Sequence, residues 1–173
     1  MNAGFLVIPL ILIRYGLLAL LGREALMRAA HFAPAAGGGE KAAYWVYQIT
    51  GLGAIVYMCF LTVAADSVWF FTGLAVYIIG AALYIASIIN YAKPAKSGLN
   101  TAVLYRFSRN PMYVAYFIYF LGCAIMTESL ILLALIAVFQ MSTHFLILSE
   151  ERWCLVKFGD EYSEYMKSVR RYI

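Results

Sequence analysis

Apolar runs long enough to cross a lipid bilayer dominate this 173-residue chain. A transmembrane helix needs about 20 mostly apolar residues. Hydrophobic residues make up 64% of the sequence and charged residues 13%, which leaves too little polar surface for a soluble domain of this size. The sequence therefore predicts an all-α membrane protein that forms a single membrane domain over residues 1–173. We expect about five transmembrane helices, in residues 5–21, 43–64, 68–91, 111–126 and 129–148.

The positions of the basic side chains predict the orientation. Every Lys and Arg except Arg14 falls in residues 22–42, 92–110 or 149–173. With an odd number of spans these three segments lie on one side of the membrane, and the connections on the other side carry no Lys or Arg. The positive-inside rule makes the basic side cytoplasmic. We therefore expect the amino terminus outside and the carboxyl terminus in the cytoplasm, in a prokaryotic inner or plasma membrane.

The first expected span and the connection after it have two unusual features. Arg14 interrupts the apolar run, and an arginine at that depth is costly. Its side chain either snorkels toward the lipid headgroups or contacts a ligand, and both interpretations stay open. Residues 23–41 contain Pro34 and a run of three glycines, which is typical of a flexible loop.

Chemically versatile side chains gather in the second half of the chain, on the expected cytoplasmic side. One group is the sequence Ser-Arg-Asn-Pro-Met-Tyr at residues 108–113. Pro111 suits the first turn of a helix, and Asn110 can cap that helix. Arg109 and Tyr113 then lie at the mouth of the fourth expected span, where we expect them to contact a ligand.

A second group begins inside the fifth expected span with His144 and continues with Glu150 and Glu151. Positions seven apart nearly coincide on a helix, so His144 and Glu151 share one face, and Glu150 lies about a third of a turn away. A histidine at membrane depth in line with a carboxylate predicts a polar pocket. The alternative is a hydrogen bond that only holds the helices together.

The chain is expected to close with a short amphipathic helix. Phe-Gly-Asp at residues 158–160 predicts a break in the helix before it. The residues that follow place tyrosines and aliphatic side chains on one side and Lys167, Arg170 and Arg171 on the other. This pattern is typical of a helix that lies at the cytoplasmic membrane surface.

These two groups, in this order and at this spacing, resemble a known superfamily. The chain is similar to the integral-membrane S-adenosylmethionine-dependent methyltransferases, which include isoprenylcysteine carboxyl methyltransferase and phosphatidylethanolamine N-methyltransferase. Residues 108–113 match the family's S-R-[HN]-P-x-Y, and His144 with residues 150–173 resembles its carboxyl-terminal pattern. Ala115 stands where the family usually has glycine. The resemblance covers residues 98–173, the methyltransferase-like catalytic half, whereas the three amino-terminal spans in residues 1–91 carry no signature of it.

The resemblance implies a reaction and roles for individual residues. The expected activity is methyl transfer from S-adenosylmethionine to a lipophilic acceptor at the cytoplasmic face, either an isoprenylcysteine-like carboxylate or a phospholipid amine. An in-line displacement at a sulfonium needs no metal, and no set of His, Cys and carboxylate residues has zinc spacing. Acceptor positioning or activation falls to Glu151 and Arg171. Cofactor binding falls to Arg109, Asn110, Tyr113, His144 and Glu150.

Two readings from other classes stay open. One is a relative of the membrane sterol reductases, which use a nicotinamide cofactor. The other is a small scaffold or transport protein without enzymatic activity. A soluble Rossmann enzyme is excluded because the sequence shows no alternation of strands and helices. No nucleic-acid partner is expected, because the net charge of +4 is spread over loops and the tail rather than gathered in a stripe.

Overall fold

The computed structural model describes residues 1–23, 27, 37–93 and 97–173 of the chain. Within these residues the secondary structure is helical, and the one β contact is an isolated bridge between Asn2 and Thr62. The all-α class expected from the sequence is therefore confirmed for the described residues. The elements are η1 (Ala3–Leu6), α1 (Val7–Ile11), η2 (Leu12–Leu17), α2 (Leu18–Leu21), α4 (Gly38–Met58), α5 (Trp69–Ala92), η3 (Val103–Arg106), α6 (Pro111–Thr127), α7 (Leu130–Phe158) and α8 (Asp160–Ser168).

Among the described residues, three helical segments are long and apolar enough to cross a membrane. They are the continuous run Ala3–Leu21 and the helices α5 and α7. Helix α6 is apolar but has 17 residues, a length of about 26 Å at 1.5 Å per residue. Helix α4 has 21 residues but begins with a polar turn that contains Glu40 and Lys41. The chain is thus an integral membrane protein with three candidate spans, and the count of five remains a prediction.

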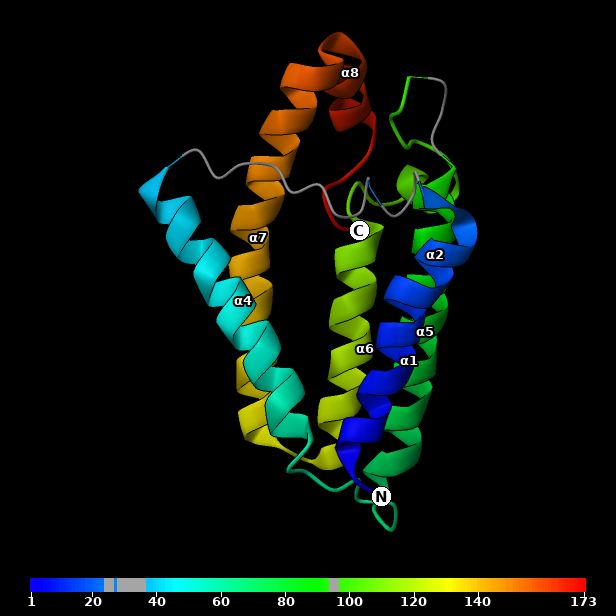
Figure 1. The fold of residues 1–173 in the computed structure, drawn as a ribbon, viewed down its shortest axis with the longest axis vertical. Helices are drawn as coiled ribbons and strands as arrows, with labels where there is room; N and C mark the ends of the chain where they lie inside the picture. The colour runs from blue at the N-terminus through cyan, green and yellow to red at the C-terminus, as the bar shows by residue number, and fades with distance from the viewer. Residues whose placement is uncertain (24–26, 28–36, 94–96) are drawn as a thin grey trace.

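The long helices run side by side between two ends of the molecule, and the chain changes end with each of them (Figure 1). The amino terminus and the connections from α4 to α5 and from α6 to α7 lie at one end. Helix α8, the carboxyl terminus and the start of α6 lie at the other end (Figure 1). The three basic segments therefore share one end in the parts that the structure describes. Which side of the membrane that end faces remains a prediction.

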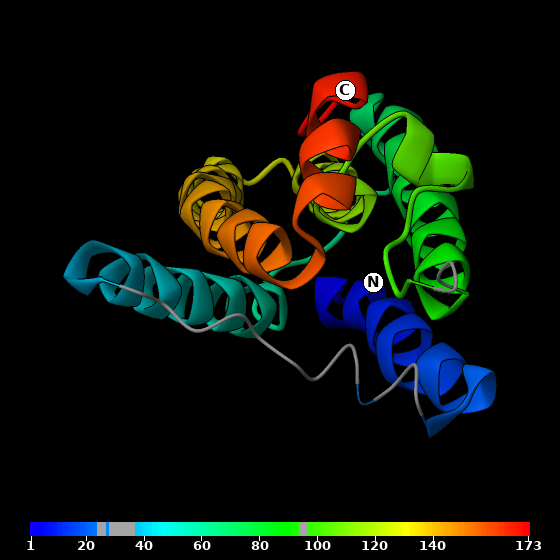
Figure 2. The same ribbon diagram turned by 90° about the horizontal axis from the view of Figure 1, so that it is seen from above.

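Helices α5 and α6 approach most closely because glycines line their contact. A Cβ added to Gly80 would lie 2.6 Å from the Cα of Tyr119, and one added to Gly122 would lie 2.6 Å from the Cα of Tyr77. Close backbone approach through small residues is the usual way that membrane helices pack. Helix α4 packs on α7 instead, on the other side of the bundle (Figure 2).

The second expected span has different bounds from those predicted. Helix α4 covers Gly38–Met58 rather than residues 43–64. It ends early because residues 61–63 pair with the amino terminus, through hydrogen bonds from Ala3 N to Leu61 O and from Val63 N to Met1 O (2.9 and 2.8 Å). Its first turn includes Gly38 to Lys41, which we expected in a loop. The rest of that expected loop lies mostly outside the described residues.

Helix α7 extends ten residues beyond the expected end of the fifth span and stops at Phe158. Gly159 has a φ of +55°, a backbone conformation that favours glycine, and α8 begins at the next residue. The break predicted at residues 158–160 is confirmed. The Tyr162 and Tyr165 side chains of α8 are buried in a small cluster with Leu99. This part of the apolar face of α8 therefore contacts protein.

Candidate active site

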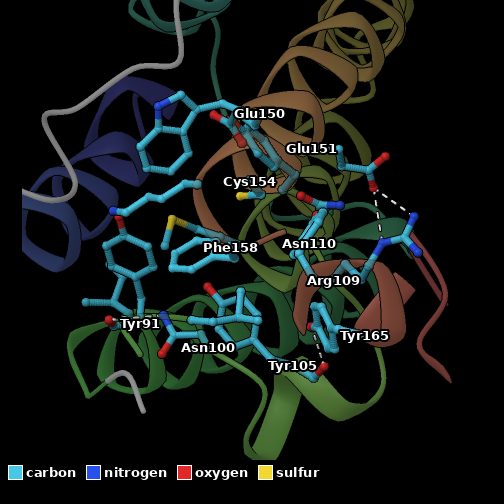
Figure 3. Close-up of a pocket in the computed structure, with 18 of the residues that line it drawn as sticks. Tyr91, Asn100, Tyr105, Arg109, Asn110, Glu150, Glu151, Cys154, Phe158 and Tyr165 are labelled. Atoms are coloured by element: carbon cyan, nitrogen blue, oxygen red, sulfur yellow. Dashed lines mark hydrogen bonds and ion pairs between the residues drawn. The ribbon is translucent and has the colours of Figure 1, made fainter. Parts of the chain in front are cut away.

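A cavity of about 590 Å³ opens between the helices at the end of the bundle that carries α8. Its size falls in the usual range for small-molecule sites, about 300–1,000 Å³. Side chains from the first helical run, from α4, α5, η3, α6, α7 and α8, and from the connection after α5 line it. Figure 3 shows Glu150, Cys154 and Phe158 of α7 on one side of the cavity, opposite Tyr91 and Asn100.

One edge of the cavity is closed by two arginines on a single carboxylate. Arg109 donates to Glu151 Oε1 from Nε and Nη2 at 3.1 and 2.8 Å (Figure 3). Arg171 donates from Nε to both carboxylate oxygens at 3.1 Å and from Nη2 to Oε2 at 2.7 Å. The exposed fractions of the Arg109 and Glu151 side chains are 7% and 5%, so this ion pair is buried. These hydrogen bonds also raise the pKa of the Arg171 guanidinium.

The same residues attach the carboxyl-terminal tail to the start of α6. Arg109 Nη1 donates to the carbonyls of Met166 and Val169, both at 2.9 Å, and its backbone N–H donates to the Arg170 carbonyl. Asn110 Nδ2 donates to the Arg171 carbonyl at 3.1 Å instead of capping α6. The loop before α6 and the helix α8 therefore meet at one end of the molecule, as the predicted site requires.

His144 contacts the tail rather than the cavity. Its Nδ1 lies 2.7 Å from the hydroxyl of Tyr172. Burial raises the pKa of Tyr172, so this hydroxyl keeps its proton at neutral pH. His144 contacts Tyr172, and Glu151 pairs with the preceding residue, Arg171. The expectation that His144 and Glu151 share one face of the helix is therefore confirmed.

Glu150 points to a different partner from its neighbour. Its Oε1 accepts a hydrogen bond from the hydroxyl of Tyr113 at 2.8 Å. Within the described residues Tyr113 is its one hydrogen-bond donor and no arginine or lysine pairs with it, so Oε2 carries no hydrogen bond. Both side chains line the cavity. Glu150 therefore presents an uncommitted carboxylate oxygen, whereas both oxygens of Glu151 are engaged by guanidinium groups.

Aromatic rings make up much of the cavity wall. Lys157 lies over the rings of Trp153 and Phe158, at 4.5 and 5.1 Å from their centroids. Tyr165 donates to the Tyr105 carbonyl at 2.6 Å, which fixes η3 against α8 (Figure 3). Rings of this kind attract cations and stack on planar heterocycles. The aromatic lining consists of Tyr47, Tyr84, Tyr91, Tyr105, Tyr113, Tyr116, Trp153, Phe158, Tyr162 and Tyr165.

The structure brings five of the seven predicted site residues to the cavity wall and leaves two away from it. His144 and Arg171 do not line it and instead hold or form the tail. The functional roles of all seven residues remain predictions. The five that line the cavity are Arg109, Asn110, Tyr113, Glu150 and Glu151.

Several lining residues were not selected from the sequence. Tyr47, Tyr84 and Asn100 come from the amino-terminal half and the connection after α5, where no motif marks them. The available signal was weak: a tyrosine inside an apolar span carries a hydroxyl that needs a partner. Arg14 was singled out from the sequence, and it lines the cavity.

A family model described as phospholipid methyltransferase matches residues 64–161 of the chain. The matched range takes in α5, α6 and α7 completely, and with them the Tyr113 and Glu150 pair. It leaves out the first helical run and the tail residues Arg171 and Tyr172. Neither the curated proteins nor the solved structures contain a match.

Proposed function

The chain belongs to the phospholipid methyltransferase family and is a membrane methyltransferase, and on that premise we propose that it uses S-adenosylmethionine to methylate a lipophilic acceptor at the cytoplasmic face. The acceptor is either a phospholipid amine or an isoprenylcysteine-like carboxylate. The single observation that carries the proposal is the carboxylate of Glu150, uncommitted at one oxygen, in an aromatic cavity of about 590 Å³. This combination is suited to a cationic, heterocycle-bearing ligand.

The residues present fit such a cofactor. S-adenosylmethionine, when bound, supplies an electrophilic methyl group on a sulfonium. Glu150 offers its free oxygen to an ammonium group, and Tyr113 holds the other oxygen at 2.8 Å, which fixes the carboxylate. The rings around the cavity give faces for a cation and for an adenine. We assign cofactor binding to Glu150, Tyr113, Asn110 and Arg109, the last two at the edge where the tail crosses α6.

We assign positioning roles to Glu151, Arg171 and His144. Five hydrogen bonds from two guanidinium groups leave Glu151 poorly suited to accept a proton. Glu151 and Arg171 instead join α7, the start of α6 and the tail, and so hold Arg109 and Asn110 against the cavity. His144 holds Tyr172 in the same way. The tail itself does not line the cavity, and its proposed role is to hold the residues at the cavity edge in place.

The acceptor side of the proposal rests on apolar side chains that line the same cavity. Leu18, Ile88 and Met112 line it between helices whose outer faces carry large exposed hydrophobic side chains. An acyl or prenyl chain matches such a surface. If the acceptor is an amine, the free oxygen of Glu150 is a suitable proton acceptor; if the acceptor is a carboxylate, the reaction needs no base.

Calorimetric titration of the purified protein tests the proposal against its alternatives. We expect S-adenosylhomocysteine to bind and a nicotinamide dinucleotide not to bind. Glu150→Ala should weaken S-adenosylhomocysteine at least about tenfold, because a hydrogen bond to a charged group contributes about 1.5–3 kcal/mol. Glu164→Ala, which removes an exposed carboxylate from α8, is the matched control and should change nothing.

The other outcomes separate the remaining classes. Binding of the dinucleotide alone would favour the reductase reading. Binding of neither ligand would favour a scaffold or transport protein. Equal affinity of Glu150→Ala and the wild type for S-adenosylhomocysteine would show that the cofactor lies elsewhere.

A further inference from the structure

Arg14 occupies a segment of unusual helix geometry. The run Ala3–Leu21 is α-helical at Val7–Ile11 and Leu18–Leu21, but residues Leu12–Leu17 between them form a π-helix. Such turns are rare, and they are frequently found at functional sites. An apolar span that only fills the bilayer has no need of one. The π-helical turn therefore contains the one arginine of this span.

Among the described residues the guanidinium of Arg14 has tyrosine hydroxyls as partners but no carboxylate. Its Nη1 donates to the hydroxyl of Tyr116 at 2.7 Å, and its CZ lies 5.9 Å from the centroid of the Tyr15 ring. A guanidinium has five N–H donors. In the described part of the chain no carboxylate pairs with Arg14, and the hydroxyls beside it, those of Tyr116 and Tyr84, are too few to engage all five donors. A charge inside a membrane helix normally faces a partner or a cavity, and Arg14 lines the cavity.

Two tyrosines hold this guanidinium in place. The hydroxyls of Tyr116 and Tyr84 lie 2.7 Å apart, and the two rings contact at a centroid distance of 4.5 Å. Tyr84 is fully buried and Tyr116 is 8% exposed. A residue that snorkels to the headgroups would not be tied to buried hydroxyls on α5 and α6. The arrangement presents a fixed cation with free donors to the interior of the site.

The cavity thus carries opposite charges on different walls. Glu150 on α7 supplies a negative group and Arg14 on the first helical run supplies a positive one, and Lys157 on α7 is a further cation in the lining. Both side chains line the same cavity, together with Tyr47 and Tyr113. A cation beside Glu150 and an anion beside Arg14 would complement this arrangement.

We propose that Arg14 binds the anionic group of the lipophilic acceptor, a phosphodiester or a carboxylate, with Tyr116 and Tyr84 positioning its guanidinium. This inference rests on the proposed methyltransferase function and specifies the acceptor: it is an amphiphile whose negative charge lies next to the methylated group, as in a phospholipid amine, or is the methylated group, as in a carboxylate. The acceptor is favoured over the carboxylate of the cofactor because Arg14 lies in an apolar span, and the apolar side chains of Leu18 and Ile88 line the same cavity. Arg109 and Asn110, in contrast, are engaged by the tail.

Native mass spectrometry of the delipidated protein, released from detergent, tests the inference with defined probes. The phosphodiester probe is dioleoylphosphatidylethanolamine, compared with dioleoylglycerol, which lacks the anion. The carboxylate probe is farnesylcysteine, compared with its methyl ester. We expect the wild type to prefer one anionic probe over its neutral counterpart by about tenfold, and the preferred pair identifies the source of the anion. S-adenosylhomocysteine affinity is measured on the same samples.

Arg14→Gln should abolish the preference and leave the affinity for S-adenosylhomocysteine within about twofold of the wild type. Arg106→Gln is the matched control, because it removes an exposed arginine that lines no part of the cavity, and it should keep both properties. Retention of the preference in Arg14→Gln would overturn the inference and leave the proposed function standing. Loss of S-adenosylhomocysteine binding alone would assign Arg14 to the cofactor and would also overturn it.

A second variant decides the case in which Arg14→Gln loses both ligands. Tyr116→Phe keeps the charge of Arg14 and removes its hydrogen-bond partner. A severalfold weaker preference for the anionic probe, with S-adenosylhomocysteine binding retained, supports the inference; an unchanged preference overturns it. Failure of the wild type to bind S-adenosylhomocysteine would contradict the proposed function itself and is read separately from the lipid comparison.

Discussion

The substitution Glu151→Gln should release the carboxyl-terminal tail from the bundle. The Glu151 carboxylate is 5% exposed and accepts hydrogen bonds from two arginines at 2.7–3.1 Å. Removing one partner of a buried ion pair costs about 3–5 kcal/mol, because a buried charge loses its counter-charge. Arg109 would keep its two carbonyl acceptors, and Arg171 is 31% exposed and can be hydrated. The lower end, about 3 kcal/mol, is therefore expected.

Amide hydrogen exchange of the protein in detergent measures this loss locally. A cost of about 3 kcal/mol corresponds to exchange about 100-fold faster in α8 and the tail, with the contact between α5 and α6 unaffected. Glu164→Gln is the matched control on α8: its pair with Lys167 has side chains 71% and 70% exposed and should contribute less than about 1 kcal/mol. Unchanged exchange of α8 in Glu151→Gln would refute the reasoning, since the buried ion pair would then not hold the tail.

Two further predictions concern the bundle. Gly122→Ala should lower the free energy of unfolding by about 1–3 kcal/mol, because the added Cβ meets the backbone of α5. The melting transition in detergent measures this loss. Gly53→Ala is the control and should not lower the stability, because a Cβ at Gly53 has no atom within 4 Å. In a variant without native cysteines, Arg106→Cys and Asp66→Cys should react with a membrane-impermeant maleimide from opposite sides of the membrane, with Arg106→Cys reacting from the cytoplasm. Reaction of both positions from one side would exclude the single span expected between residues 66 and 106.

Local signals in the sequence were enough to predict where several helices begin or end. Pro111 begins α6, and Gly159 follows the last residue of α7. Both effects are local, because the missing N–H of proline and the positive φ of glycine change the backbone only at those residues. Helical periodicity also placed His144 and Glu151 on one face. The charge distribution required the basic segments to share one end, and the described helices place them there.

Contacts between distant parts of the chain were not predictable from such signals. The hydrogen bond from Asn110 to the Arg171 carbonyl replaces the expected helix cap, and it depends on where the tail folds back. The early end of α4 depends on pairing of residues 61–63 with the amino terminus. In the same way, a buried tyrosine pair on α5 and α6 holds Arg14. Each of these follows from tertiary packing, about which one sequence says little.

The different partners of Glu150 and Glu151 show the same limit within two adjacent residues. The sequence predicts that they lie about a third of a turn apart on the helix. It does not predict which side chain each of them contacts. The packing of α6 and the tail against α7 decides this: Glu150 accepts a hydrogen bond from Tyr113, and Glu151 pairs with both arginines. That difference separates the proposed cofactor ligand from the proposed positioning residue.

Methyl transfer to membrane lipids is the most direct test of the central proposal. The purified protein is incubated with tritium-labelled S-adenosylmethionine and a total extract of membrane lipids, and the lipid fraction is separated and counted. We predict labelled lipid that depends on the protein, is lost with Glu150→Ala and is retained with Glu164→Ala. Absence of label in lipid with the wild type, or equal labelling by Glu150→Ala, would contradict the proposed function and its assignment to this cavity.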